Sequence, residues 1–228
     1  MAVRKRESKI TDSERQLFRS VLSTLIANGI YGNLVAIHED MNHNQHGGMG
    51  AIGRQRFLTW HRVFLLRLEQ AMQAENPAAF IPYWDWTTKR SVPQWLQSFR
   101  PTVNVPGQGA ITVTREPGEP PVLPTKTHVQ SILSETTFTA FTTQLEFAHN
   151  NVHGWVGGTM ANIEISPADP LFWMHHAQID RLWSRWQAKK VNKGKGPTLT
   201  GSKRVMDPWT ETVDDVVSIK ALGYSYGK

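Results

Sequence analysis

The sequence has no cysteine among its 228 residues. This absence excludes a disulfide scaffold, thiolate zinc sites, iron–sulfur clusters, a cysteine nucleophile and a blue-copper centre. The sequence also lacks an apolar run of about 18 residues, so we expect no transmembrane helix. No apolar stretch follows the basic N-terminus, so we expect no signal peptide. We therefore expect a protein without membrane attachment that is cytoplasmic, or that is exported together with a partner protein.

The middle of the chain has no excess of positive or negative charge. The formal net charge is +6, but acidic and basic residues nearly balance between 11 and 188. The excess lies in two flanks, at Arg4, Lys5, Arg6 and Lys9, and at Lys189, Lys190, Lys193, Lys195, Lys203 and Arg204. Such flanks are typical of solvated ends rather than of a groove-reading surface. Because no recognition motif accompanies them, we expect no binding to nucleic acid.

Large apolar residues, including nine tryptophans, indicate one compact domain over residues 1–228, with tails at about 1–10 and 189–228. Helical spacing of apolar residues predicts helices over 11–25, 33–42, 56–75, 136–153 and 169–189. The first of these begins at a capping box formed by Thr11 and Glu14. A glycine-rich loop follows at 47–53, and a proline-rich excursion spans 91–127, with a short hairpin around 111–114. The predicted fold is mostly α: an antiparallel four-helix bundle with long loops and little β structure.

Eight of the nine histidines fall into two groups, and only His128, in an expected surface segment, stands apart. His149 and His153 are spaced i, i+4, so they project from one face of a helix and could bind one metal ion. A zinc protease with this spacing needs a glutamate directly after the first histidine, whereas the residue after His149 is Asn150. The zinc-protease interpretation is therefore excluded. Adjacent histidines point about 100° apart on a helix, so only one of His175 and His176 can face the same site.

The first half of the chain offers a matching set of imidazoles. His61 lies on the apolar face of a predicted helix, and His38, His43 and His46 precede it. All-imidazole ligation suits zinc, copper, iron or nickel. Two sets of three histidines on four helices therefore predict two metal ions held close together in the bundle core.

These residues lie within longer motifs. The sequence reads RFLTWHR at 56–62, IPYWDW at 81–86 and HNNVHGWVGG at 149–158, followed by the segment 166–186. In these motifs, which spread over most of its length, the chain resembles the common central domain of tyrosinases, the type-3 copper oxidases related to catechol oxidases and haemocyanins. The resemblance implies a helical bundle that holds two copper ions. It also implies an enzyme that uses O2 to ortho-hydroxylate monophenols and to oxidise o-diphenols to o-quinones.

The resemblance also implies the copper ligands. It implies that the second copper is bound by His149, His153 and His176, and that His175 is a neighbour that does not bind metal. For the first copper, His38 and His61 match the first and third ligands. The chain departs from the family at the middle ligand, because the usual position is occupied by Ile52. We choose His46 for this role, with His43 as the alternative.

Further roles follow from the same resemblance. Glu146 and Asn150 match the pair that holds a water thought to act as a base in monophenol hydroxylation. Gly154 and Ile163 match positions at the substrate entrance. Arg4 or Arg6 is expected near the motif Tyr224-Ser225-Tyr226. Because the sequence ends shortly after this motif, we expect no shielding domain and an open entrance. The implied partners are small phenolic substrates and a separate copper-loading helper protein.

Three other functions remain open from the sequence. A catechol oxidase would act on diphenols alone, and a haemocyanin-like protein would bind O2 reversibly without oxidising catechol. A dinuclear zinc or manganese hydrolase would draw on bridging carboxylates, which neither histidine set contains. The physiological phenol, the ratio of the two phenol activities and the oligomeric state are not readable from the sequence. We expect Asp180 and Arg181 to form a structural ion pair and not to contact substrate.

Overall fold

The computed structural model describes residues 2–118 and 122–227. Eight α-helices and four short strands are present in these ranges, joined by 3₁₀ turns. The helices are α1 (Asp12–Ala27), α2 (Ile30–Glu39), α3 (Ala51–Glu75), α4 (Gln94–Gln97), α5 (Lys126–Ser134), α6 (Phe138–Val156), α7 (Pro170–Gln187) and α8 (Val213–Val216). The strands are β1 (Ala2–Arg4), β2 (Thr102–Val105), β3 (Gly109–Thr112) and β4 (Tyr224–Tyr226). The mostly helical fold with little β structure is therefore confirmed.

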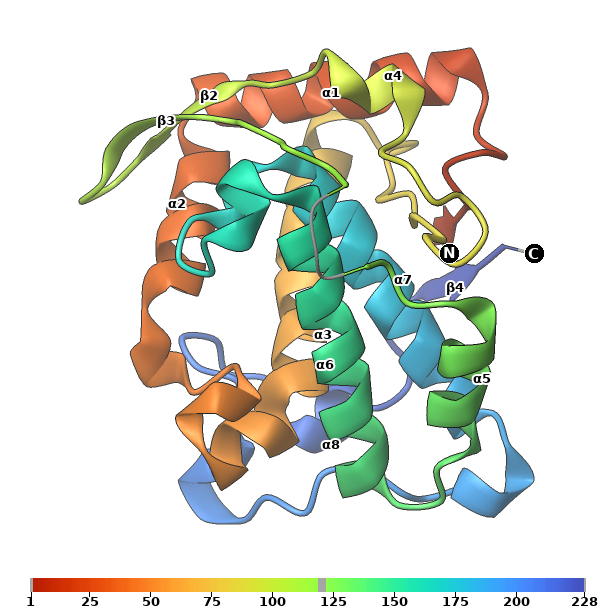
Figure 1. Ribbon diagram of the computed structural model, residues 1–228. Coiled ribbons are helices and arrows are strands. Elements are labelled where there is room, and N and C mark those ends of the chain that lie inside the picture. Colours follow the sequence, from red (N-terminus) through yellow and green to blue (C-terminus); the bar gives the residue numbers. More distant parts are fainter. Residues whose placement is uncertain (1, 119–121, 228) are drawn as a thin grey trace.

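The bundle consists of α2, α3, α6 and α7, with α3 at its centre in contact with the other three. Figure 1 shows α1 lying across one end of these helices, and α1 is bent by 79° from α2. Among the described residues no single helix is long and apolar enough to cross a membrane, and only α1 and α2 taken together pass on length and composition. The core between the helices is rich in fully buried tryptophan: Trp60, Trp84, Trp86, Trp173, Trp183 and Trp186.

Helix boundaries follow local signals. Thr11 caps α1 in the predicted capping box with Glu14. The second helix begins at Ile30, earlier than predicted, because Gly29 adopts a left-handed conformation (φ 82°) and so forms its N-cap. Gly32 then lies inside α2, where a Cβ would meet the carbonyl oxygen of Asn104. The start predicted at 33 is therefore wrong, because Gly32 serves close packing within the helix.

The excursion is more ordered than its proline content suggested. Strands β2 and β3 pair antiparallel, with Val103 opposite Ile111, so a hairpin is confirmed but begins earlier than predicted. Helix α5 was not predicted. It is short, its N-cap is Thr125, and it buries Val129, Ile132 and Leu133. Residues 119–121, which belong to this excursion, lie outside the described ranges.

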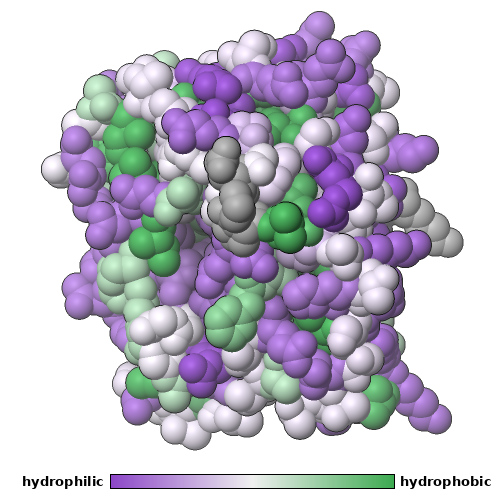
Figure 2. All heavy atoms as spheres, viewed as in Figure 1, coloured by the Kyte–Doolittle hydropathy of each residue, from purple (hydrophilic) through white to green (hydrophobic). Residues whose placement is uncertain are grey.

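Both segments that we expected to be tails pack against the bundle. Strand β1 pairs with β4 in parallel, with Arg4 opposite Tyr226. Arg4, expected on a solvated flank, is fully buried. Its guanidinium group bonds to Glu69, with Nη2 3.0 Å from Oε2, and it lies over the ring of Tyr224. Figure 2 shows that hydrophilic side chains cover most of one face of the molecule, with isolated hydrophobic ones between them.

Candidate metal centre

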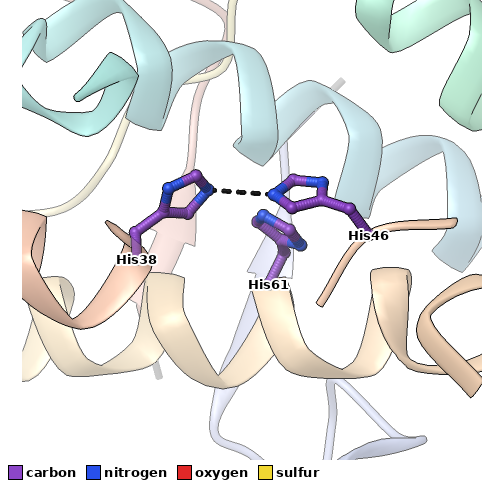
Figure 3. Close-up of side chains that lie close together, drawn as sticks. All are labelled: His38, His46 and His61. Carbon is purple, nitrogen blue, oxygen red and sulfur yellow. Dashed lines mark hydrogen bonds between the residues drawn. The ribbon is translucent and has the colours of Figure 1, made fainter. Parts of the chain in front are cut away.

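The first histidine cluster consists of His38, His46 and His61. His38 lies in the last turn of α2, His46 in the loop between α2 and α3, and His61 in the middle of α3. One ring nitrogen from each lies within 4.8 Å of the others, and the Nε2 atoms of His38 and His46 are 3.2 Å apart. Figure 3 shows the three rings turned toward one another. The structure thus brings His46, and not His43, together with the other two.

Backbone contacts orient these rings. The Nδ1–H of His61 donates to the carbonyl oxygen of Phe57 at 2.8 Å, so the lone pair is left on Nε2, which has no partner among the described residues. The loop that carries His46 lies directly on α3. A Cβ at Gly53 would be only 1.9 Å from the carbonyl oxygen of His46. The glycine therefore permits the close approach that places the middle histidine.

The second cluster consists of His149 and His153 on α6 and His176 on α7. Their ligand atoms also lie within 4.8 Å of one another, and the Nε2 atoms of His149 and His176 are 3.0 Å apart. His153 Nδ1–H donates to the carbonyl oxygen of Met160 at 2.7 Å. His149 Nδ1–H donates to the side-chain oxygen of Asn150 at 2.9 Å. These bonds turn the Nε2 atoms of both rings toward the centre of the cluster.

The remaining two histidines of these groups are used differently. The indole N–H of Trp86 donates to Nδ1 of His175 at 3.1 Å, and the His175 ring stacks on His149 with centroids 5.0 Å apart. His175 is therefore a packing neighbour, in the place that the resemblance implied. His43 lies outside the first cluster, with Nδ1 2.8 Å from a carboxylate oxygen of Asp207. His128 is exposed, as expected.

The two clusters meet where α3 packs against α7. The rings of His61 and His176 stack with centroids 4.4 Å apart and planes 14° apart. Both clusters border one cavity of about 270 Å³. Its lining comprises His38, His46, His149, Asn150, His153, Gly154, Met160, Ala161, Ile163, Ser166 and Phe172. The two sets of ligand atoms therefore open onto a space that a small molecule could enter.

Burial keeps the six imidazoles neutral. Burial lowers the pKa of His46 to about 3 and that of His153 to about 4. It also lowers the pKa values of His38, His61, His149 and His176, and neighbouring imidazoles add to the effect. Neutral imidazole is the form that binds metal. Two sets of three nitrogen donors, all buried except the half-buried His153, fit a pair of copper ions. Within the described part of the chain, Nε2 of His61 and of His153 has no hydrogen-bond partner.

Glu146 and Asn150 lie beside the clusters on α6. Glu146 is 7% exposed, accepts a hydrogen bond from the Gly47 N–H at 2.7 Å, and lies 3.8 Å from Nδ1 of His46. Burial raises the pKa of Glu146 to about 7, while the Gly47 bond and the Arg54 charge act in the opposite direction. Asn150 borders the cavity and, with Glu146, a neighbouring pocket. A carboxylate and a carboxamide thus lie at the edge of the site.

The cavity lining includes both residues that were expected at the substrate entrance. Gly154 and Ile163 belong to its lining, and Ile163 is 48% exposed. Sequence reasoning assigned no contact to Phe57, whose ring is 5.1 Å from His61 and 5.0 Å from His149 between centroids. Its place one turn before His61 on a buried helix face was the available signal.

The expected ion pair between Asp180 and Arg181 is wrong. Asp180 instead accepts a bond from Nε of Arg62 at 2.5 Å, and Arg181 lies over the ring of Tyr83. Consecutive residues on a helix point in different directions, so Asp180 faces Arg62 on α3 while the half-buried Arg181 faces Tyr83. Neither residue belongs to the cavity lining.

Comparisons with known proteins agree with this geometry. Residues 28–118 and 120–189 match the family model "common central domain of tyrosinase". The chain is 33% identical over 260 residues to a tyrosinase of Streptomyces galbus, covering 92% of this chain and 94% of that one. It is 29% identical over 209 residues to hemocyanin 2 of Megathura crenulata, covering 81% of this chain and 6% of that one. A functional unit of octopus hemocyanin superposes with a TM-score of 0.79 at 24% identity, over 100% of this chain and 68% of that one.

Proposed function

The chain belongs to the family of the tyrosinase common central domain, and we propose that it is a dicopper oxidase of phenols. In this proposal it ortho-hydroxylates monophenols and oxidises o-diphenols to o-quinones with O2. The observation that carries the proposal is the pair of three-histidine clusters that open onto one cavity. Copper would be held by His38, His46 and His61 at the first position, and by His149, His153 and His176 at the second.

A copper pair, when bound, supplies the reversible two-electron chemistry with O2. The protein's own part is to fix neutral imidazoles and to keep the site dry. The carbonyl oxygens of Phe57 and Met160 hold the Nδ1 protons of His61 and His153. The ring of Phe172 stacks on His176 with centroids 4.0 Å apart. These contacts define ring orientation before any metal binds, so little reorganisation is needed.

Monophenol hydroxylation also needs a base, because the phenol must lose its proton. We propose Glu146 as that base, acting through a water that Asn150 helps to hold. The support is geometric: the carboxylate is nearly buried beside His46, and Asn150 borders both the cavity and the pocket on the Glu146 side. The Gly47 N–H occupies Oε1 of Glu146, and the other carboxylate oxygen remains for a water.

The entrance is suited to a flat aromatic ring. Gly154 adds no side chain at the mouth, and Ile163 offers an exposed apolar edge. Apolar and aromatic groups such as Met160 and Phe172 line the interior, which suits a phenol and disfavours bulk water. We therefore propose small phenols as substrates.

Two rival functions make different predictions. The hemocyanin relatives favour an O2 carrier as the second candidate. A carrier would bind O2 reversibly and leave catechols unoxidised. A diphenol-only catechol oxidase would oxidise catechols and leave monophenols untouched.

The deciding experiment measures copper per chain and then O2 uptake with 4-methylphenol and with 4-methylcatechol. We expect two copper ions and uptake with both substrates. Uptake with the catechol alone would assign a catechol oxidase and remove Glu146 from its role. Reversible O2 binding without catechol oxidation would assign a carrier, and the absence of bound copper would refute the proposal.

A copper-loading helper protein also remains a proposal, supported by the likeness to bacterial tyrosinases. Copper-free protein should then take up two ions slowly or incompletely from free copper. Complete loading from the metal alone would show that this chain needs no helper.

A location in the cytoplasm, or export with such a partner, likewise stays a prediction, to be tested by fractionating cells that express the chain.

A further inference from the structure

We propose that Asp207 is a positioning residue for the first copper site, because it holds the loop that carries His46. This inference rests on the proposed function, since it assigns copper to the first cluster. Asp207 lies in the C-terminal segment 189–228, which was expected to be a tail. Its carboxylate binds His43 in the ligand loop and Arg56 on α3. One residue therefore joins the loop to the helix that carries His61.

The segment around Asp207 forms a small clasp, which we define as residues 205–212. The clasp is closed by a bridge between Val205 and Thr212 and by a bond from Met206 N–H to the carbonyl oxygen of Glu211 at 2.7 Å. It is tied to α3 at three points along the helix. Arg56 binds the Asp207 carboxylate. The indole N–H of Trp60 donates to the Asp207 carbonyl oxygen at 2.8 Å. Arg67 binds the Glu211 carboxylate at 2.5 Å.

The exposure of the partners shows why this carboxylate matters. Asp207 is 44% exposed at its side chain, whereas Arg56 is 5% and His43 is 12% exposed. An ion pair between two solvated groups contributes little. Here removal of the carboxylate would leave a nearly buried guanidinium group without its counter-charge, and that arrangement is costly.

The position of His43 links this pair to the metal ligands. The His43 ring stacks on Trp60 with planes 25° apart, and Trp60 in turn packs edge-on against His38 and His61. His43 is three residues before His46 in the same loop. The loop is otherwise tied by Gln45 to the carbonyl oxygen of His38 and by Gly47 to α6. Asp207 thus adds side-chain bonds that join the loop to α3, beside the packing of the His46 backbone against Gly53.

The first test uses hydrogen exchange on copper-free protein, so that it does not depend on the proposed activity. In Asp207→Ala we expect amides of residues 41–49 to exchange about tenfold faster, while amides of α6 keep their rates. Asp207→Asn should fall between the two proteins, because the amide oxygen still accepts a bond without carrying charge. The matched control is Asp214→Ala, which breaks an exposed pair with Arg204 just outside the clasp and should change nothing in the loop.

The second test counts copper at each site separately. His176→Ala should retain one copper, at the first cluster, and adding Asp207→Ala should remove it. His61→Ala should retain one copper, at the second cluster, and adding Asp207→Ala should leave it bound. Circular dichroism confirms that each variant is folded.

Three results would overturn the inference. Asp207→Ala could keep both copper ions and an unchanged loop, which would make the clasp mere packing. It could instead lose both ions and exchange faster throughout, which would make the residue a general stabiliser. Unchanged loop exchange in copper-free Asp207→Ala would refute the inference even if this variant lost copper, whereas a wild-type protein that binds no copper would refute the proposed function alone.

Discussion

Replacement of Asp180 by alanine should destabilise the protein strongly, because this carboxylate pairs with the buried Arg62 at the contact of α3 and α7 and also lies near the buried Arg4 of β1. Asp180 is 3% exposed. It accepts bonds from Arg62 at 2.5 Å, from Tyr224 at 2.7 Å and from Tyr226 at 2.5 Å, and it lies 3.4 Å from Arg4. Breaking a buried pair by removing one partner costs about 3–5 kcal/mol. For a chain of this size, that corresponds to a fall in Tm of roughly 6–20 °C.

The assay is thermal and urea unfolding of copper-free wild type, Asp180→Ala and a surface control. The control is Asp12→Ala, which breaks the exposed pair between Arg15 and Asp12 and should change the free energy of unfolding by no more than about 0.5 kcal/mol. Because total stability is on the order of 5–15 kcal/mol, Asp180→Ala should remain folded but close to its limit. A loss below about 1 kcal/mol for Asp180→Ala would refute the reasoning.

The pH dependence gives an independent check. The charges of Arg62 and Arg4, together with the tyrosine hydroxyls, lower the pKa of Asp180 against the effect of burial. A carboxylate with a lowered pKa in the folded state stabilises the protein fully above its unfolded pKa of about 3.9. That contribution is lost as the pH falls through the folded pKa. The stability difference between wild type and Asp180→Ala should therefore stay constant from about pH 5 to pH 8 and shrink only below about pH 4.

Further predictions concern the site itself. Glu146→Gln should lower monophenol hydroxylation by about 10²-fold or more and leave catechol oxidation within about threefold, as O2 uptake on both substrates would show; equal losses would exclude a base role. Gly53→Ala should displace the His46 loop, cost about 1–3 kcal/mol and reduce bound copper, whereas Gly48→Ala, whose Cβ would meet nothing within 4 Å, should be neutral. Gly154→Phe should raise the KM for 4-methylcatechol roughly tenfold by narrowing the mouth; an unchanged KM would place substrate entry elsewhere.

Much of the fold could be predicted from periodicity because the four bundle helices bury long apolar faces. Helix α5 was missed because it is short and follows a proline-rich segment. Its Thr125 cap and its spacing of Val129, Ile132 and Leu133 were present in the sequence, but nine residues give a weak signal. The packing of the two end segments could not be predicted, since it depends on where Arg4 finds Glu69 and Asp180 across the fold.

The candidate site, like the fold, could be predicted from the sequence only in part. Spacing alone pointed to His149 and His153, because helical neighbours share a face whatever the rest of the chain does. The middle histidine of the first cluster could not be derived in this way. His43 and His46 lie in an irregular loop, where no periodicity says which ring turns inward. Residues outside the loop determine which of the two rings joins the cluster. Asp207 binds the ring of His43 away from the cluster, and Gly53 permits the backbone of His46 to approach α3.

The same helix contact that holds the two clusters together also holds the buried charges. Arg62 directly follows His61 on α3, and Asp180 lies one turn after His176 on α7. The ion pair between Arg62 and Asp180 and the ring stack between His61 and His176 are therefore two layers of one interface. If that interface sets the spacing of the clusters, copper should bind the native state less tightly in Asp180→Ala, and the stabilisation that copper gives should shrink with it. If copper stabilises both proteins equally, the imidazoles are held by their own carbonyl partners, and the ion pair serves the fold alone.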